Sequence, residues 1–179
     1  MIGKRNKVAK QARFDGLCSI YCLVNAVRNW GESSFGPDDN DSLRYFLEAA
    51  DRLRLFTVHR VMGGFEAHEI IDIFNEFARA HRFPGKAVHL SAMAEALERW
   101  SFSVQVKRVF EQHGQIIVPV DEGDHWVLAY DHDFEKPGLK IDDSDPTIKR
   151  AWLKYDKVHE AGLQGVILLP SNCTLSFPE

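Results

Sequence analysis

Hydrophobic residues in the first half of the chain recur three and four positions apart, which is the spacing of amphipathic helices. This spacing predicts a helix from about Cys18 to Asn29. Asp41 or Ser42 is suited to cap a second helix, a third is expected through residues 70–77, and Ser91 is suited to cap a fourth. The expected core faces are Ile20, Leu23, Val24, Val27 and Trp30; Leu43, Phe46, Leu47, Ala50 and Leu53; Ile70, Ile73, Phe74 and Phe77; and Ala94, Leu97 and Trp100.

The pattern changes in the second half, where short apolar runs predict strands. Residues 102–106 alternate between apolar and polar, which favours a strand. Ile116 to Val120 is a continuous apolar run, and because Pro119 has no N–H to donate, we place this mostly buried strand near a sheet edge. Further strands are expected at residues 126–130, 139–142 and 164–169.

Helices followed by an antiparallel run of strands argue for an α+β fold. We expect the helix that begins at Cys18 to pack across a small, mainly antiparallel sheet. Residues 1–179 are expected to form one domain, with a flexible start at residues 1–10 and a helical subregion at residues 31–100. Within that subregion, residues 62–65 are expected to form a loop.

Composition narrows the functional classes. The chain is 45% hydrophobic and 27% charged, as in ordinary globular proteins, and its net charge of -4 gives no field that favours nucleic acid or a membrane surface. There is no run of ~18 apolar residues and no secretory signal at the charged N-terminus. The three cysteines are too few for a disulfide framework. We therefore expect a cytoplasmic protein, although delivery elsewhere as an effector is compatible with these features.

Cys18 is the strongest candidate for reactive chemistry. A cysteine attacks as the thiolate, whose formation is favoured by the positive end of a helix dipole and by a neighbouring imidazolium. Cys18 begins a predicted helix, and Gly16 gives the backbone freedom to enter it sharply. Cys22 lies one turn further on, beside apolar residues, and is expected to be a buried core residue.

Among the eight histidines, His125 stands out because it follows the polar turn at residues 121–124 and begins an apolar strand. The next strand returns the chain toward His125 and ends at Asp142, Asp143 and Asp145, any of which could orient the imidazole. These aspartates are also good turn residues. We find no spacing of cysteine and histidine typical of a zinc site.

Acyl transfer also requires donors directed at the oxyanion that develops on the substrate carbonyl. The backbone N–H of Cys18, at the helix start, is one candidate. The side-chain amide of Gln11, one short loop upstream, is the second.

The order Gln11, Cys18, His125 and the run Ile141–Pro146 resembles the papain-like cysteine peptidases, in particular the bacteriocin-processing peptidases that cut double-glycine leaders. This resemblance implies a papain-like fold, no metal or organic cofactor, and hydrolysis of an amide in a peptide or protein. It also implies the site residues: Cys18 as nucleophile, His125 as general base and acid, Gln11 as oxyanion donor, and Asp143 as the acid that orients His125.

The chain departs from that family in two places. Six residues separate Gln11 from Cys18 where the family usually has five, and Ser19 replaces a glycine that often follows the cysteine. The run Asp15–Cys18 is also similar to the nucleophile loop of ovarian-tumour-type deubiquitinases, whose histidine comes near the end without a long return hairpin.

Three hypotheses of function follow. The first is a cysteine hydrolase that cleaves a peptide or isopeptide bond through a thioester acyl-enzyme, with a peptide or protein as its partner. The second is a transglutaminase-like acyltransferase or a protein deamidase with the same triad, because His125 with Trp126-Val127 and a later Asp-Pro also resembles a transglutaminase core. The third is a non-catalytic binding domain with a degenerate site.

Overall fold

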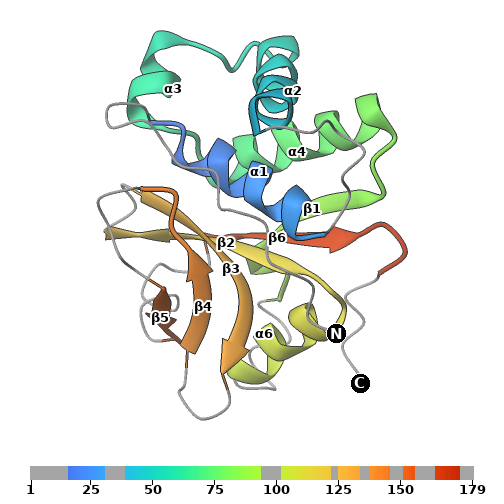
Figure 1. The fold of residues 1–179 in the computed structure, drawn as a ribbon, viewed down its shortest axis with the longest axis vertical. Coiled ribbons are helices and arrows are strands. Elements are labelled where there is room, and N and C mark those ends of the chain that lie inside the picture. Colours follow the sequence, from blue (N-terminus) through green and yellow to red (C-terminus); the bar gives the residue numbers. More distant parts are fainter. Residues whose placement is uncertain are drawn as a thin grey trace.

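A computed structural model describes residues 16–30, 39–93, 102–121, 125–133, 138–145, 151–155 and 164–173. These residues form a six-stranded antiparallel sheet with helices on both faces (Figure 1). The sheet order is β1-β6-β2-β3-β4-β5. The strands are β1 (Gly85–His89), β2 (Gln115–Val120), β3 (His125–Asp133), β4 (Gly138–Asp142), β5 (Trp152–Lys154) and β6 (Val166–Pro170). The helices are α1 (Cys18–Asn29), α2 (Asp39–Arg52), α3 (Val58–Gly63), α4 (Ala67–His81) and α6 (Phe102–Glu111), with a short 3-10 helix at Leu90–Met93.

Helix α1 lies directly on one face of the sheet, and α6 covers the opposite face (Figure 1). The apolar stripe of α1 is buried against residues of β2, β3 and β6 such as Ile117 and Leu128. On the other face, Ile116 and Val118 pack with residues of α6 such as Val109. Successive residues of β2 therefore face different cores, which explains why the strand is apolar at every position from Ile116 to Val120.

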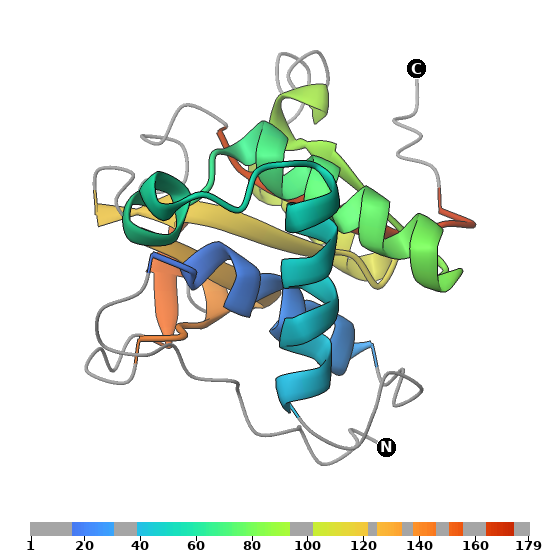
Figure 2. The same ribbon diagram turned by 90° about the horizontal axis from the view of Figure 1, so that it is seen from above.

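An aromatic cluster joins α1, α2 and α4 above the sheet. Phe74 of α4 lies within 6.4 Å of Trp30, Phe46, Phe77 and Phe83, measured between ring centroids. Phe46, Phe74 and Phe77 are fully buried. Seen from above, α2 crosses over α1, and α4 runs beside it (Figure 2). The cluster thus holds the helical layer together on top of the helix that carries Cys18.

Most of the predicted elements are confirmed. The α+β class, the helix that starts at Cys18 and its packing across an antiparallel sheet are all present. Helix α4 and strands β3, β4 and β6 lie where the pattern predicted them. The loop expected at residues 62–65 begins later, because α3 continues to Gly63.

The strand predicted at residues 102–106 is wrong, because these residues form the first half of α6. An alternation over only five residues did not distinguish the two-residue period of a strand from the 3.6-residue period of a helix. The fully buried positions are Gln105, Val106 and Val109, which share one face of a helix and not one face of a strand.

The edge position predicted for the strand with Pro119 is also wrong, since β2 is the third strand of the sheet and pairs on both sides. Its pairing with β6 covers only residues 115–117. Pro119 pairs with Trp126 of β3 and lies past the end of that ladder. The missing N–H therefore costs no ladder hydrogen bond.

Strands β1 and β5 were not predicted. Residues 31–100 accordingly contain the strand Gly85–His89 as well as helices. The helix predicted after Ser91 falls largely on residues outside the described part of the chain, as does the flexible start at residues 1–10. In the described part, no helix combines the length and apolar character needed to span a membrane.

We predict that Phe74→Ala lowers the free energy of unfolding by roughly 3–5 kcal/mol, because it leaves a cavity among four other rings. Val58→Ala, at an 83% exposed position of α3, should change it by less than about 0.5 kcal/mol. Urea denaturation of both variants measures this. Equal losses would contradict the assignment of Phe74 to the centre of the helical core.

Candidate active site

Cys18 is the first residue of α1 and is only 4% exposed. The preceding loop is fixed to the end of α3, because Gly16 donates its backbone N–H to the carbonyl oxygen of Val61 at 2.6 Å. A Cβ atom on Gly16 would lie 2.7 Å from the backbone nitrogen of Gly64. Only glycine allows this approach, so the entry to the helix and the helical layer are packed backbone against backbone.

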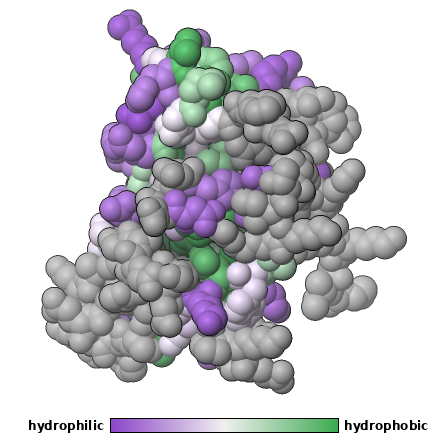
Figure 3. Space-filling model, turned by 90° about the vertical axis from the view of Figure 1, so that its left-hand side faces the viewer, coloured by the Kyte–Doolittle hydropathy of each residue, from purple (hydrophilic) through white to green (hydrophobic). Residues whose placement is uncertain are grey.

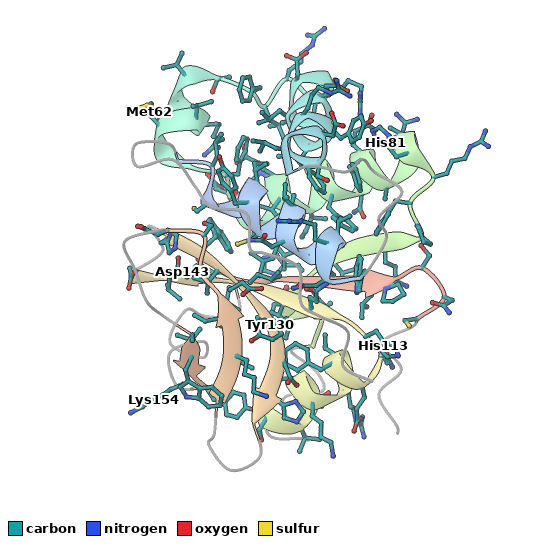
Figure 4. The ribbon with its side chains drawn as sticks, viewed as in Figure 1. Met62, His81, His113, Tyr130, Asp143 and Lys154 are labelled. Atoms are coloured by element: carbon teal, nitrogen blue, oxygen red, sulfur yellow. The ribbon has the colours of Figure 1, made fainter. Side chains whose placement is uncertain are left out.

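His125 begins β3, beside the end of β2, and its side chain is 13% exposed. Its Nε2 atom lies 2.8 Å from Oδ1 of Asp143, whose side chain is 2% exposed. Cys18 is close enough to the ring for a hydrogen bond with it to contribute to the raised pKa of His125. Figure 4 shows Asp143 below the start of α1, between that helix and the sheet.

These contacts determine the charge of the imidazole. Burial alone would lower the pKa of His125, since it disfavours the charged ring. The hydrogen bonds to Asp143 and Cys18, together with the negative charges of both groups, outweigh burial and raise the pKa of His125 from 6.5 to about 10. At neutral pH the ring is therefore an imidazolium, the state that stabilises a neighbouring thiolate.

The three aspartates that the sequence left as alternatives have different positions. Asp143 is the one in contact with His125. Asp145 contributes its backbone N–H, which donates to Oδ1 of Asp143 at 3.0 Å. Asp142 ends β4, and its Oδ2 lies 3.5 Å from Nδ2 of Asn29 at the other end of α1. The structure thus brings Cys18, His125 and Asp143 together.

Cys22 has a different environment although it is one helical turn from Cys18. It is 1% exposed, and its Sγ donates to the carbonyl oxygen of Trp126 at 3.4 Å. Burial raises the pKa of Cys22 well above its usual value, and the negative charges of Cys18, Asp143 and Asp142 raise it further. Cys22 is therefore a protonated thiol, and its predicted place in the core is confirmed.

Cys18 and His125 open onto a cleft of about 710 Å³. Its sheet side includes Pro119 and Trp126, and its helical side includes the end of α3 and the loop that follows, residues 62–66. Figure 3 views this side of the molecule, where hydrophilic and hydrophobic residues of the described part are interspersed. The sequence predicted a loop at residues 62–65 but did not place it near Cys18.

Ionic contacts stiffen the helical wall of the cleft. Nη2 of Arg60 lies 2.9 Å from Oε1 of Glu69 and 3.2 Å from Oε1 of Glu66. The other carboxylate oxygen of Glu69 accepts the backbone N–H of Glu66 at 2.8 Å and caps α4. Glu69 is only 4% exposed, so breaking this arrangement would leave a buried charge without its compensation.

Gln11 lies outside the described residues, and its role as oxyanion donor stays a prediction. Within the described ranges, no group of three or more His, Cys, Asp or Glu side chains is arranged to hold a metal ion. Cys173, the remaining cysteine, is half-buried, and its sulfur donates to the carbonyl oxygen of Gln112 after α6, which covers the face of the sheet opposite α1.

Gly16→Ala should lower the free energy of unfolding by roughly 1–3 kcal/mol, because the added methyl group meets backbone atoms that have no room to move. Gly63→Ala is the matched control, since a Cβ there has nothing within 4 Å. Urea denaturation compares the two. If Gly16→Ala is as stable as Gly63→Ala, the close contact between the nucleophile loop and α3 is wrong.

The charge on His125 should make stability depend on pH. A raised pKa means that the folded chain holds the proton more tightly than the unfolded chain, so the stabilisation is complete below pH 6.5 and is lost as the pH rises to about 10. The difference in free energy of unfolding between the natural chain and His125→Gln should therefore shrink across this range. Denaturation series at several pH values measure it, and a constant difference would contradict the raised pKa.

Comparison with known proteins agrees with this architecture. No protein-family model matches the chain, and no curated protein matches it. Among solved structures, the chain is similar to the peptidase domain of Streptococcus ComA, a bifunctional ABC transporter involved in a quorum sensing pathway. The likeness covers 92% of this chain and 98% of that domain, with a TM-score of 0.53 and 14% sequence identity. The chain therefore has the papain-like α+β fold of a peptidase domain, as its sequence predicted.

Proposed function

We propose that the chain is a cysteine peptidase that cleaves a peptide bond in a peptide or protein substrate through a thioester acyl-enzyme. The observation that carries this proposal is the hydrogen-bonded series Cys18–His125–Asp143 at a cleft. Each part has the chemistry that the reaction requires: a thiol at a helix start, a base beside it, and a buried carboxylate on Nε2 of that base. The peptidase fold supports the same reading.

In the first half of the reaction, the Cys18 thiolate attacks the carbonyl carbon of the scissile bond. The negative charge that moves to the carbonyl oxygen is stabilised by the backbone N–H of Cys18 and, in this proposal, by the side-chain amide of Gln11. The C–N bond then breaks, and the imidazolium of His125 gives its proton to the leaving amine. The acyl group remains on Cys18 as a thioester.

In the second half, His125 takes a proton from a water molecule, and the resulting hydroxide attacks the thioester carbonyl. The C–S bond breaks, the carboxylic acid product leaves, and Cys18 departs as a thiolate beside the protonated ring. Asp143 holds the ring in one orientation and stabilises its positive charge in both halves. The backbone N–H of Asp145 keeps the Asp143 carboxylate in place.

The first substrates to test are peptides that contain two adjacent glycines before the scissile bond, together with a panel of unrelated peptides. The resemblance to double-glycine leader peptidases motivates the first group, and so does the likeness to a transporter's peptidase domain. Mass spectrometry separates the alternatives. A cleaved chain supports the proposal, whereas a cross-linked product or the mass gain of deamidation would replace it with acyl transfer or deamidation by the same residues.

Cys18→Ala should reduce kcat/KM for the cleaved peptide by at least ~10³-fold, because it removes the attacking atom. Cys22→Ala should retain activity within about tenfold, since the Cys22 thiol is buried, protonated and bonded to a backbone carbonyl. Circular dichroism of both variants shows whether the fold is retained. A folded Cys18→Ala variant that cleaves the peptide at the natural rate would disprove the proposed mechanism.

A further inference from the structure

Hydrogen bonds fasten the C-terminal end of α1, the end opposite Cys18, to the start of β2. Nε2 of Gln115 donates to the carbonyl oxygen of Ala26 at 2.8 Å, and Nδ2 of Asn29 donates to Oε1 of Gln115 at 3.2 Å. The indole Nε1 of Trp30 donates to the carbonyl oxygen of His113 at 2.6 Å. We call these five residues the α1 anchor. Gln115 is its centre, because its amide both donates and accepts.

The anchor differs in kind from the rest of the contact between α1 and the sheet. Most of that contact is apolar, between residues such as Leu23 and Leu128, and apolar packing is non-directional. Apolar contacts resist a shift of the helix through close packing alone, without directional bonds. Gln115 is only 3% exposed, so water cannot replace the hydrogen bonds of its amide. Loss of these bonds would leave a buried polar group unsatisfied and would destabilise the fold. It therefore favours one position of the helix over its neighbours.

The strand that contains Gln115, β2, is paired with β3, the strand that begins at His125. Gln115 begins β2, and Val120 at the other end of β2 pairs with His125. Asn29 also approaches Asp142, the residue before Asp143, at 3.5 Å. At about 1.5 Å per residue, the 12 residues of α1 span roughly 18 Å as a rigid rod. A shift at the anchor is thus carried along the rod to Cys18.

We propose that Gln115 is a positioning residue for the Cys18–His125 pair, which it acts on from the far end of α1 by fixing where the helix lies along β2. The proposal rests on the proposed function only in taking Cys18 and His125 as the working pair. A hydrogen bond weakens steeply when its distance or angle changes, so a small displacement of Cys18 is enough to weaken its contact with His125.

The chain contains a matched control for this idea. Asn75 of α4 also joins a helix to a strand through a side-chain amide: its Oδ1 accepts the N–H of Ala87 at 2.9 Å, and its Nδ2 donates to the carbonyl oxygen of Ala87 at 3.2 Å. Ala87 belongs to β1, an outer strand of the sheet. Loss of this amide should weaken the fold without moving α1 relative to β3.

The test is the pH profile of Cys18 alkylation by iodoacetamide in the full chain, followed on the Cys18-containing peptide by mass spectrometry. It needs no substrate. Gln115→Met should move the midpoint of the profile upward by about one pH unit, which lowers the rate below the midpoint by about tenfold. Asn75→Leu should lower the urea midpoint and leave the profile unchanged. A folded Gln115→Met variant with the natural profile, or an equal shift in Asn75→Leu, would overturn the proposal.

Asn29→Ala provides a second route if Gln115→Met does not fold. It removes the bond to Oε1 of Gln115 and the longer contact with Oδ2 of Asp142, and it leaves the bond from Gln115 to Ala26. We expect a smaller shift in the same direction, and no shift would reject the anchor. If Gln115→Met shifts the profile but the natural chain cleaves no peptide, the positioning role of Gln115 is supported and the peptidase proposal fails.

Discussion

The ion pair between His125 and Asp143 is the interaction on which the rest of the site depends. A charged ring that is mostly buried is costly unless it is paired and hydrogen-bonded. The Asp143 carboxylate, 2.8 Å from Nε2, supplies that compensation, and the negative charge of Cys18 adds to it. Removal of the Asp143 carboxylate would change the protonation of the ring, and with it the reactivity of the Cys18 sulfur. The site is therefore a single electrostatic unit.

The fold positions the members of this unit by two different means. His125 is held by its pairing with Val120 in the β2–β3 ladder, and Asp143 directly follows Asp142, which pairs with Leu128 at the end of the β3–β4 ladder. Cys18 belongs to a helix, which no ladder aligns with the sheet. Its position depends on Gly16 at one end of α1 and on the hydrogen bonds of Gln115 at the other. Apolar packing fills the space between them.

The sequence predicted those parts of the fold whose signals are local. The stripe of α1, the start of a strand at His125 and the return of β4 to an acidic turn could all be recognised from spacing and turn residues. The site residues Cys18 and His125 followed from these elements. The residue pattern alone left three aspartates open. The resemblance to papain-like peptidases implied Asp143, and Asp143 is the aspartate whose Oδ1 lies 2.8 Å from the ring.

Other features of the fold could not be predicted from the local sequence pattern. Strand β1 exists because β6 pairs with it, and its own five residues carry no strong alternation. Residues 102–106 have a strand-like pattern, but the helix continues to Glu111 and buries one face on the sheet. Pro119 is tolerated in the third strand of the sheet because the neighbouring ladder ends before it. From the sequence, Gly16 was expected to give the backbone freedom to enter the helix sharply. The structure shows that glycine is required there because the backbone of residues 61–64 lies too close for a Cβ atom.

The central claim is that His125 is protonated at neutral pH because it lies between Asp143 and Cys18. The most direct measurement is an NMR titration of the His125 imidazole in the isotopically labelled chain. We predict that the ring stays protonated through pH 8 and titrates at a pKa of about 10. Titration near the ordinary histidine value of ~6.5 would contradict the account, since the ring would then be neutral when the sulfur is to be activated.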